Sequence, residues 1–350
     1  MSFLKVDNLI KLSVAALTCI GGQAVQAEET NTVAAKNETA AAKNETAVAK
    51  KETAVARNSE NKISAAGSGN VDNITSWKDL SASSRMKNVD GLHYYEFKTD
   101  NGSNAFLLVV DLISKNWQLK PVVNQSTATT TATTCRVDAV ASVNGAFFNL
   151  TNGESTSYVT VSGQLLCDPH KNKALTENVK LKPFLETIYK RSELRILKDK
   201  IGRLHFSIAP HFAPTAHDLT IVHAIQAGPR LLPTLTDKEE AFVRTEAGGT
   251  IVDSIGVNRP AARTAIGITK DGGHALLLCV ASKRQDEFSS GLTLAELAEL
   301  FKRLGCTEAL NLDGGTSTTM SVKLSDDTVH MVCGREPETL VKSTLSVFKN

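Results

Sequence analysis

The sequence lacks the features that mark membrane-spanning and nucleic-acid-binding proteins. Beyond the amino terminus, no apolar run approaches the ~20 residues that a transmembrane helix needs. Its 39 lysines and arginines nearly balance its 37 acidic residues, and they are spread along the chain. A basic surface for phosphate backbones is therefore not predicted. We expect neither a nucleic-acid partner nor membrane insertion of the mature protein.

Metal-binding patterns are also missing. Five cysteines follow Cys19, and this odd number leaves at least one without an intramolecular disulfide partner, while the pairing of the others stays open. The histidines between residues 205 and 223 show neither His-x-His nor His-Glu-x-x-His spacing. We therefore expect no metal site and no cofactor.

Residues 1–27 have the pattern of an export signal. Lysines precede an apolar run at 12–20, and small residues at positions 25 and 27 favour cleavage after Ala27. A lipoprotein signal ending at Cys19 is the alternative, and Thr18 argues against it because a smaller residue is usual there. The mature protein is therefore expected to be secreted or periplasmic.

Residues 28–72 are predicted to be a low-complexity spacer. Within it, residues 34–57 repeat a unit such as Lys-Asn-Glu-Thr-Ala every seven residues. Alanine and lysine favour helix, and a period of seven permits a coiled coil. The apolar positions hold only Ala and Val, which are too small to drive firm pairing. A solvated, partly helical spacer is therefore favoured over a coiled coil.

Residues 73–350 predict an α+β domain with a mixed β-sheet core and few helices. Apolar runs with strand character at 94–98 and 105–112 flank a turn at 100–103. The Lys-rich stretch 168–200, partly helical in pattern from Leu181 to Leu197, is either a surface excursion, which we favour, or a lid over the site.

One helix is well specified. Thr293 and Glu296 form a capping box at its start, and Gly305 provides a stop. It separates predicted strands at 275–280 and 308–312, which indicates a βαβ unit with parallel strands. The strand ends would then face one active cleft.

The segment 311–320, Asn-Leu-Asp-Gly-Gly-Thr-Ser-Thr-Thr-Met, gathers one carboxylate, one amide and several hydroxyls around a Gly-Gly turn. It follows a predicted strand, and polar loops at strand ends are where open α/β sheets bind ligands. Glycines let backbone N–H groups approach a ligand, and such a concavity favours anions. A ligand site centred on Asp313 is therefore predicted.

Three further segments extend this pattern. They are Val-Asn-Gly-Ala-Phe-Phe-Asn at 143–149, Ala-Ile-Gln-Ala-Gly-Pro-Arg-Leu-Leu at 224–232 and Arg-Thr-Ala-Ile-Gly-Ile at 263–268. With 311–320, in this order, they make residues 90–348 resemble the phosphodiester glycosidase family. The resemblance implies that the four segments form the active cleft. The family more often has glycine at the positions held here by Ala146, Gln226, Ala227 and Thr316.

The chemistry of such a substrate needs few groups. A glycosyl phosphodiester is cleaved through an oxocarbenium-like transition state, and its phosphate ester leaves as a stable anion. We assign the catalytic carboxylate to Asp313, as nucleophile or as base. We assign the phosphate clamp to Arg263, because a guanidinium matches phosphate bidentately. Asn144 completes the catalytic set, since its amide can hold sugar hydroxyls.

Further substrate contacts are predicted from the same segments. Backbone N–H groups come from Gly145, Gly228, Gly314 and Gly315, and side chains come from Gln226, Arg284, Asn311, Thr316, Ser317 and Thr318. Phe147 and Phe148 could stack on a sugar, although core positions are favoured for them.

The sequence thus predicts a hydrolase that cleaves the glycosidic bond of a sugar-1-phosphodiester in an exported polysaccharide or glycoconjugate. Two alternatives stay open. A metal-assisted phosphodiesterase would break the P–O bond, and a non-catalytic envelope glycan-binding protein would use the repeat as a tether. Retention of Asp313 together with Arg263 favours catalysis over binding alone.

Overall fold

A computed structural model describes residues 74–82, 89–281, 291–324 and 328–350. All of them belong to one compact unit, residues 65–350. The predicted signal at 1–27 and the predicted spacer at 28–72 lie outside the described residues, and so does Arg284.

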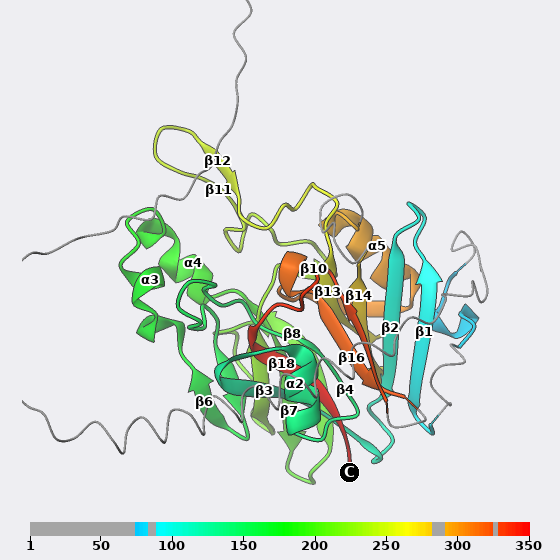
Figure 1. The fold of residues 1–350 in the computed structure, drawn as a ribbon. Coiled ribbons are helices and arrows are strands. Elements are labelled where there is room, and N and C mark those ends of the chain that lie inside the picture. Colours follow the sequence, from blue (N-terminus) through cyan, green and yellow to red (C-terminus); the bar gives the residue numbers. More distant parts are fainter. Residues whose placement is uncertain (1–73, 83–88, 282–290, 325–327) are drawn as a thin grey trace, which may run out of the picture. The chain divides into compact units, whose positions relative to one another are not determined.

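Three β-sheets form most of this unit (Figure 1). The first has the strand order β1-β2-β14-β13-β15-β10, the second β17-β16-β4-β18-β3, and the third β6-β5-β9-β7-β8. The first sheet comprises β1 (Leu92–Lys98), β2 (Asn104–Asp111), β14 (His274–Val280), β13 (Arg263–Thr269), β15 (Cys306–Asn311) and β10 (Arg230–Leu232). The second comprises β17 (Val329–Cys333), β16 (Thr319–Lys323), β4 (Ala141–Asn144), β18 (Val341–Lys349) and β3 (Trp117–Ala128). The third comprises β6 (Gln164–Cys167), β5 (Val159–Val161), β9 (Leu219–Gln226), β7 (Ser192–Asp199) and β8 (Leu204–Pro210).

The other elements are short. A separate hairpin pairs β11 (Val243–Thr245) with β12 (Ile251–Asp253). The α-helices are α2 (Thr130–Arg136), α3 (Lys173–Thr176), α4 (Leu185–Tyr189) and α5 (Leu294–Arg303), and the 3₁₀ turns are η2 (Trp77–Asp79), η3 (Pro169–Lys171), η4 (Lys182–Phe184) and η5 (Gly315–Ser317). The predicted character, mainly β-sheet with few helices, is confirmed. None of the described helices combines the length and apolar character needed to cross a bilayer.

The three sheets share one hydrophobic core, and β2 shows how the chain builds it. Leu108 and Val110 join the core common to the three sheets, whereas Leu107 and Val109 join a second cluster that includes α5. Both faces of the strand are therefore buried, which explains its unbroken apolar run. The predicted hairpin is confirmed, because β1 and β2 pair antiparallel from Leu92 opposite Val110 to Lys98 opposite Asn104.

Helix α5 forms where the sequence predicts it. The Thr293 hydroxyl accepts from the Glu296 amide at 3.2 Å, and the Glu296 carboxylate accepts from Thr293. Its apolar face packs on the first sheet, and Gly267 of β13 permits the close approach. A Cβ added at Gly267 would lie 2.5 Å from the Phe301 ring, so the position has room only for hydrogen.

The expected βαβ unit takes a different form. Both β14 and β15 pair antiparallel with β13, so they run in the same direction with β13 between them. Helix α5 therefore connects two co-directional strands that are not hydrogen-bonded to each other. The strand pairings described in the first sheet are all antiparallel.

The prediction of helical character from Leu181 to Leu197 is correct only in its first half. Helix α4 ends at Tyr189, and Ser192 begins strand β7, which lies between β8 and β9. From Ser192 to Leu197 every residue is buried. A central strand covered on both faces carries no clean alternation, so its pattern resembles a buried helix.

Candidate active site

The four segments of the sequence pattern meet at the end of β15. The Leu312 amide donates to the Thr264 carbonyl at 2.8 Å, and the Asp313 amide donates to the Gly145 carbonyl at 3.0 Å. The Gly228 amide donates to the Asn311 carbonyl at 2.9 Å. The loop carrying Asp313 is thereby fastened to strands of the first and second sheets. Segments separated by up to 175 residues in sequence, such as Asn144 and Thr319, come into direct contact.

The Asn144 side chain connects the Asp313 loop to β13 and β16 through hydrogen bonds. Its side chain is fully buried at the end of β4. Its Nδ2 donates to the Asp313 carbonyl at 2.5 Å, while its Oδ1 accepts from the Thr264 hydroxyl at 2.6 Å and from the Thr319 amide at 3.0 Å. These bonds occupy most of the amide's capacity. Asn144 therefore holds the Asp313 loop, and protein groups are the partners of its amide.

Asp313 as a whole residue is partly exposed at this junction, while its carboxyl is largely desolvated. Its Oδ1 accepts from the Gly314 amide at 3.0 Å, and the Ser317 hydroxyl also hydrogen-bonds to the carboxyl. Burial raises the pKa of Asp313 to about 7, although the hydrogen bonds from Ser317 and Gly314 oppose that rise. Near neutral pH the group is therefore divided between its acid and carboxylate forms, which is the state of a group that exchanges protons during turnover.

Polar atoms around Asp313 retain hydrogen-bonding capacity. Asn311 donates through Nδ2 to the carbonyls of Gly228 at 2.9 Å and Leu312 at 2.8 Å. Its Oδ1 and the hydroxyls of Thr318 and Thr319 are buried without a partner in the part of the chain that the structure describes. Thr316 is partly exposed on η5. The predicted hydroxyl-rich character of the loop is thus retained in three dimensions.

The predicted backbone anion site is not formed. The amide of Gly145 donates to the Ser343 carbonyl at 2.9 Å, and that of Gly315 donates to the Ala262 carbonyl at 2.8 Å. The amides of Gly228 and Gly314 are equally occupied, by the Asn311 carbonyl and the Asp313 carboxyl. Gly145 is needed instead for close packing, because an added Cβ would lie 2.8 Å from the Ser343 hydroxyl.

Arg263 is buried, and backbone carbonyls occupy its guanidinium. It is 3% exposed at the start of β13. Its Nε donates to the Leu292 carbonyl at 2.8 Å, its Nη1 to Ile255 at 2.9 Å, and its Nη2 to Gly256 at 2.5 Å and Arg259 at 2.9 Å. Burial lowers its pKa to about 10. The guanidinium therefore holds the loop before β13, and this geometry counts against the predicted clamp.

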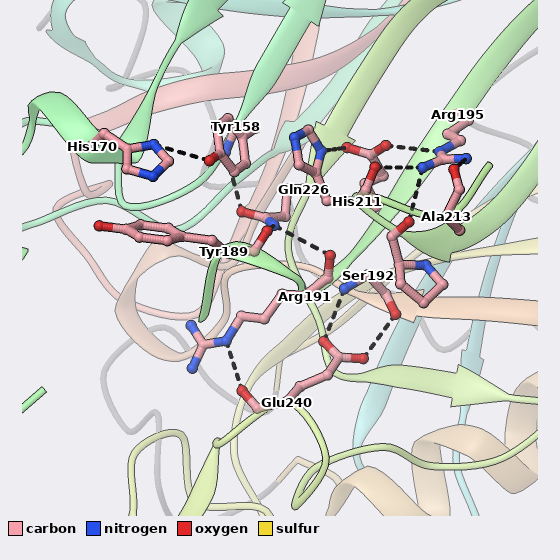
Figure 2. Close-up of polar contacts among 12 residues, drawn as sticks. Tyr158, His170, Tyr189, Arg191, Ser192, Arg195, His211, Ala213, Gln226 and Glu240 are labelled. Atoms are coloured by element: carbon pink, nitrogen blue, oxygen red, sulfur yellow. Dashed lines mark hydrogen bonds and ion pairs between the residues drawn. The ribbon is translucent and has the colours of Figure 1, made fainter. Parts of the chain in front are cut away.

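Gln226 also serves the scaffold (Figure 2). Its Oε1 accepts from the Tyr158 amide at 3.2 Å, and its Nε2 donates to the carbonyls of Tyr189 at 2.9 Å and Arg191 at 3.2 Å. The carboxamide cross-links three chain segments where the family more often has glycine. A role in substrate contact is not supported by this arrangement.

The third sheet contains a buried ion cluster that sequence reasoning passed over (Figure 2). Glu193 accepts from Arg195 Nε at 2.8 Å, and its other oxygen lies 2.5 Å from His211 Nδ1. Arg195 also donates to the carbonyls of Ala213 and Pro210. Within the described ranges, no group of three or more His, Cys, Asp or Glu side chains is arranged to hold a metal.

Arg191, which no sequence pattern singled out, is a candidate cation for binding an anionic group. Its Nε donates to the Glu240 carbonyl at 2.9 Å, and its guanidinium lies 3.7 Å from the centre of the Phe242 ring. The Phe242 ring in turn contacts Phe147, 5.5 Å between centroids, two residues beyond Gly145. The residue as a whole is partly exposed, its guanidinium is largely desolvated, and its two terminal nitrogens have no hydrogen bond with any residue the structure describes. No motif marked this residue, because its side-chain contacts, Glu240 and Phe242, are distant in sequence.

The expected cleft at the strand ends is not confirmed. Two cavities, of about 580 and 470 Å³, lie elsewhere, and neither is lined by residues 311–320. Phe147 packs against the main core cluster, in agreement with the core position favoured from the sequence.

Comparison with known proteins agrees with the sequence pattern. The model of the phosphodiester glycosidase family matches residues 138–348. The fold resembles the zebrafish N-acetylglucosamine-1-phosphodiester α-N-acetylglucosaminidase catalytic domain auto-inhibited by its pro-peptide, at 16% identity and a TM-score of 0.54 over 78% of this chain and 88% of that chain. It also resembles a hypothetical protein from Synechocystis, at 15% identity and a TM-score of 0.52 over 75% of this chain. The match spans 63% of that cyanobacterial protein. No curated protein matches.

Proposed function

Because this chain belongs to the phosphodiester glycosidase family, we propose that it hydrolyses the glycosidic bond of a sugar-1-phosphodiester in an exported polysaccharide or glycoconjugate. The observation that carries the proposal is the position and ionisation of Asp313. It lies where the four sequence segments meet, and burial raises its pKa to about 7.

The reaction is a substitution by water at the anomeric carbon. The bond between that carbon and the phosphate oxygen breaks, the phosphate monoester leaves with the bonding electrons, and water supplies the new anomeric hydroxyl and one proton. In its carboxylate form, Asp313 either attacks the anomeric carbon or accepts the proton from water. The phosphate is already a good leaving group, so one carboxylate is sufficient in this scheme.

The other residues take roles that follow from their contacts. Asn144 and Arg263 are positioning residues, since their hydrogen bonds hold the Asp313 loop and the loop before β13. Arg191 takes the place of Arg263 as the cation for the phosphate, because its terminal nitrogens are open and it stacks on Phe242 beside Phe147. Neither a metal nor a cofactor enters this scheme.

Isotope labelling tests the proposal directly. The protein is incubated in H₂¹⁸O with a panel of sugar-1-phosphodiesters, beginning with an N-acetylglucosamine-1-phosphodiester, the class named for the zebrafish relative. The expected result is ¹⁸O at the anomeric carbon and none in the phosphate. Label in the phosphate would instead indicate P–O cleavage by a phosphodiesterase. Binding without turnover across the panel would favour the glycan-binding alternative.

A further inference from the structure

The larger cavity lies between the segment η4–α4 and the β11–β12 hairpin, about 580 Å³ in volume. This volume falls within the ~300–1,000 Å³ range of small-ligand sites. Its wall combines an aromatic ring, two cations, one carboxylate and hydroxyls, and the lining residues are Phe184, Thr187, Lys238, Glu239, Ala241, Val243, Arg244, Thr245 and Ile251.

Arg244 has an unusual position in this wall. Its side chain is 11% exposed and pairs with Glu246 at 2.8 Å through Nη2. Its Nε is buried and has no hydrogen-bond partner among the described residues. The guanidinium also lies 5.5 Å from the centre of the Phe184 ring. Since Nε is closed to solvent, an occupant of the cavity would meet the guanidinium at its terminal nitrogens, of which Nη2 is paired with Glu246 and Nη1 has no hydrogen bond within the described residues.

The rest of the wall suits a charged sugar. Lys238 is exposed, and its ammonium makes no hydrogen bond or ion pair within the described structure. Arg244 is already paired with Glu246, so Lys238 supplies the positive charge of the lining that is not used in an ion pair among the described residues. The half-buried Phe184 ring offers an apolar face for a sugar, while Thr187 and Thr245 offer hydroxyls. Guanidinium and ammonium groups are the usual partners of phosphate.

Packed residues link the wall of the cavity to the segment that holds Asp313. The Asp313 amide bonds to the Gly145 carbonyl, and Phe147 of the same segment contacts Phe242. Phe242 immediately precedes Val243 of the cavity wall and carries Arg191 on its ring. Burial lowers the pKa of Arg191 to about 9, an effect that Glu240 opposes and Arg244 reinforces. An anion close to Arg191 would favour its charged form.

We propose that this cavity is a subsite for a second, phosphate-bearing sugar unit of a polymeric substrate, next to the unit whose bond is cleaved. The inference rests on the proposed function and goes beyond it by assigning the protein to chains of sugar phosphates. Arg244 and Lys238 bind the second phosphate, and Phe184 packs against its sugar.

The test compares two substrates and three variants of the full chain. The probes are an N-acetylglucosamine trimer joined by 1-phosphodiester bonds and the single-unit methyl phosphodiester. Arg244→Gln and Lys238→Gln should each raise KM for the trimer about 10-fold, the loss of one charge-assisted hydrogen bond, with less than about 2-fold change for the single unit. Glu246→Gln is the matched control, because it removes the ion pair and keeps the guanidinium; its trimer KM should not rise.

The outcomes separate the subsite from the proposed function. Three outcomes would overturn the subsite and leave the proposed hydrolysis intact. They are an equal rise in KM for both probes, no rise in KM for the trimer, and a rise in trimer KM that Glu246→Gln reproduces. If the wild type hydrolyses neither these probes nor any other member of the sugar-1-phosphodiester panel, the proposed function fails, and trimer binding measured by calorimetry then decides the subsite. The subsite is supported if Arg244→Gln and Lys238→Gln bind the trimer more weakly than the wild type while Glu246→Gln does not. Unchanged trimer binding by the first two variants overturns it. Because Lys238 is exposed, its substitution tests the subsite even if Arg244→Gln destabilises the hairpin.

Discussion

At the scale of single residues, hydrogen-bonding capacity decides which predicted groups can act on a substrate. Asp313 is partly exposed and its carboxyl has a raised pKa, and its assignment as the catalytic group stays a prediction. Arg263 and Gln226 were assigned to substrate from the same motifs, yet backbone groups occupy them. A motif identifies a residue type at a position, whereas its remaining donors depend on carbonyls brought from other segments.

Asp313→Asn should reduce turnover by at least ~10²-fold, the low end of general acid–base catalysis, because the amide cannot attack or accept a proton. Substrate binding should persist, since the amide still forms hydrogen bonds. Steady-state kinetics and calorimetric binding measure the two effects. A stable variant with near-normal turnover would remove Asp313 from the mechanism.

The same substitution should raise the melting temperature at pH 8. The carboxyl titrates near 3.8 when unperturbed and near 7 in the folded protein, so the folded state binds more protons between these values. The unfolding free energy of the wild type therefore falls as pH rises through this window, and the full destabilisation by the ionised carboxyl is present above pH 7. Asparagine carries no charge and removes this destabilisation. The difference in melting temperature between the two proteins should vanish below about pH 4.

Activity should depend on pH through the same group. A nucleophile or base must be ionised, so kcat/KM should rise as pH increases through about 7 and then level off. The profile is measured with the single-unit phosphodiester. A profile that falls through this region would show that Asp313 acts in its protonated form, as an acid.

Arg263 and Arg191 should respond in opposite ways to substitution. Arg263→Lys loses several charge-assisted hydrogen bonds to carbonyls and should cost at least ~2 kcal/mol of unfolding free energy, measured by urea denaturation. Arg203→Lys, with 72% of the side chain exposed, is the control and should cost little. Arg191→Gln should instead raise KM with a smaller effect on stability. If Arg263→Lys instead raised KM with little effect on stability, and Arg191→Gln mainly reduced stability, Arg263 would be restored as the phosphate clamp.

At the scale of elements, short sequence patterns predicted the helices and turns that are stabilised by interactions between residues close in sequence. The capping box of α5 and the hairpin β1–β2 form as expected, because their partners are close in sequence. The pairing of β14 and β15 did not follow from the connecting helix, since β13 comes between them. Strand β7 was interpreted as partly helical, because burial on both faces removes the period that distinguishes a strand.

The packing of α5 on β13 gives a prediction at this scale. Gly267→Ala should destabilise the fold by ~1–3 kcal/mol, the range for overpacked cores, because its Cβ would meet the Phe301 ring at 2.5 Å and the Cys306 sulfur at 2.6 Å. Gly273→Ala is the matched control: its nearest contact, at 3.0 Å, is the end of the exposed Ile113 side chain, which can move. Chemical denaturation of both variants gives the comparison. Equal stabilities would show that α5 can shift without cost.

At the scale of the whole molecule, the described fold lies within residues 65–350, and the matched family region is 138–348. The export signal and the repeat stay predictions. A chain beginning at residue 70 should retain its melting temperature and turnover, because residues 28–69 contain almost no large apolar side chains to bury. Amino-terminal sequencing of the exported protein should find Glu28 first. A large loss of thermal stability in the shorter chain would show that the repeat packs on the domain.

The sequence alone determined the family, the predominance of strands, the limits of α5 and the position of the Asp313 loop after a strand. Each depends on residues that are neighbours in the chain or on motifs that can be recognised one by one. Only the tertiary structure decided that Asn144 and Arg263 hold the site, that Arg191 keeps open donors, and that Arg244 lines a cavity. The physical reason is common to all four. Their roles depend on which polar groups from distant segments reach them, and sequence spacing does not specify those contacts.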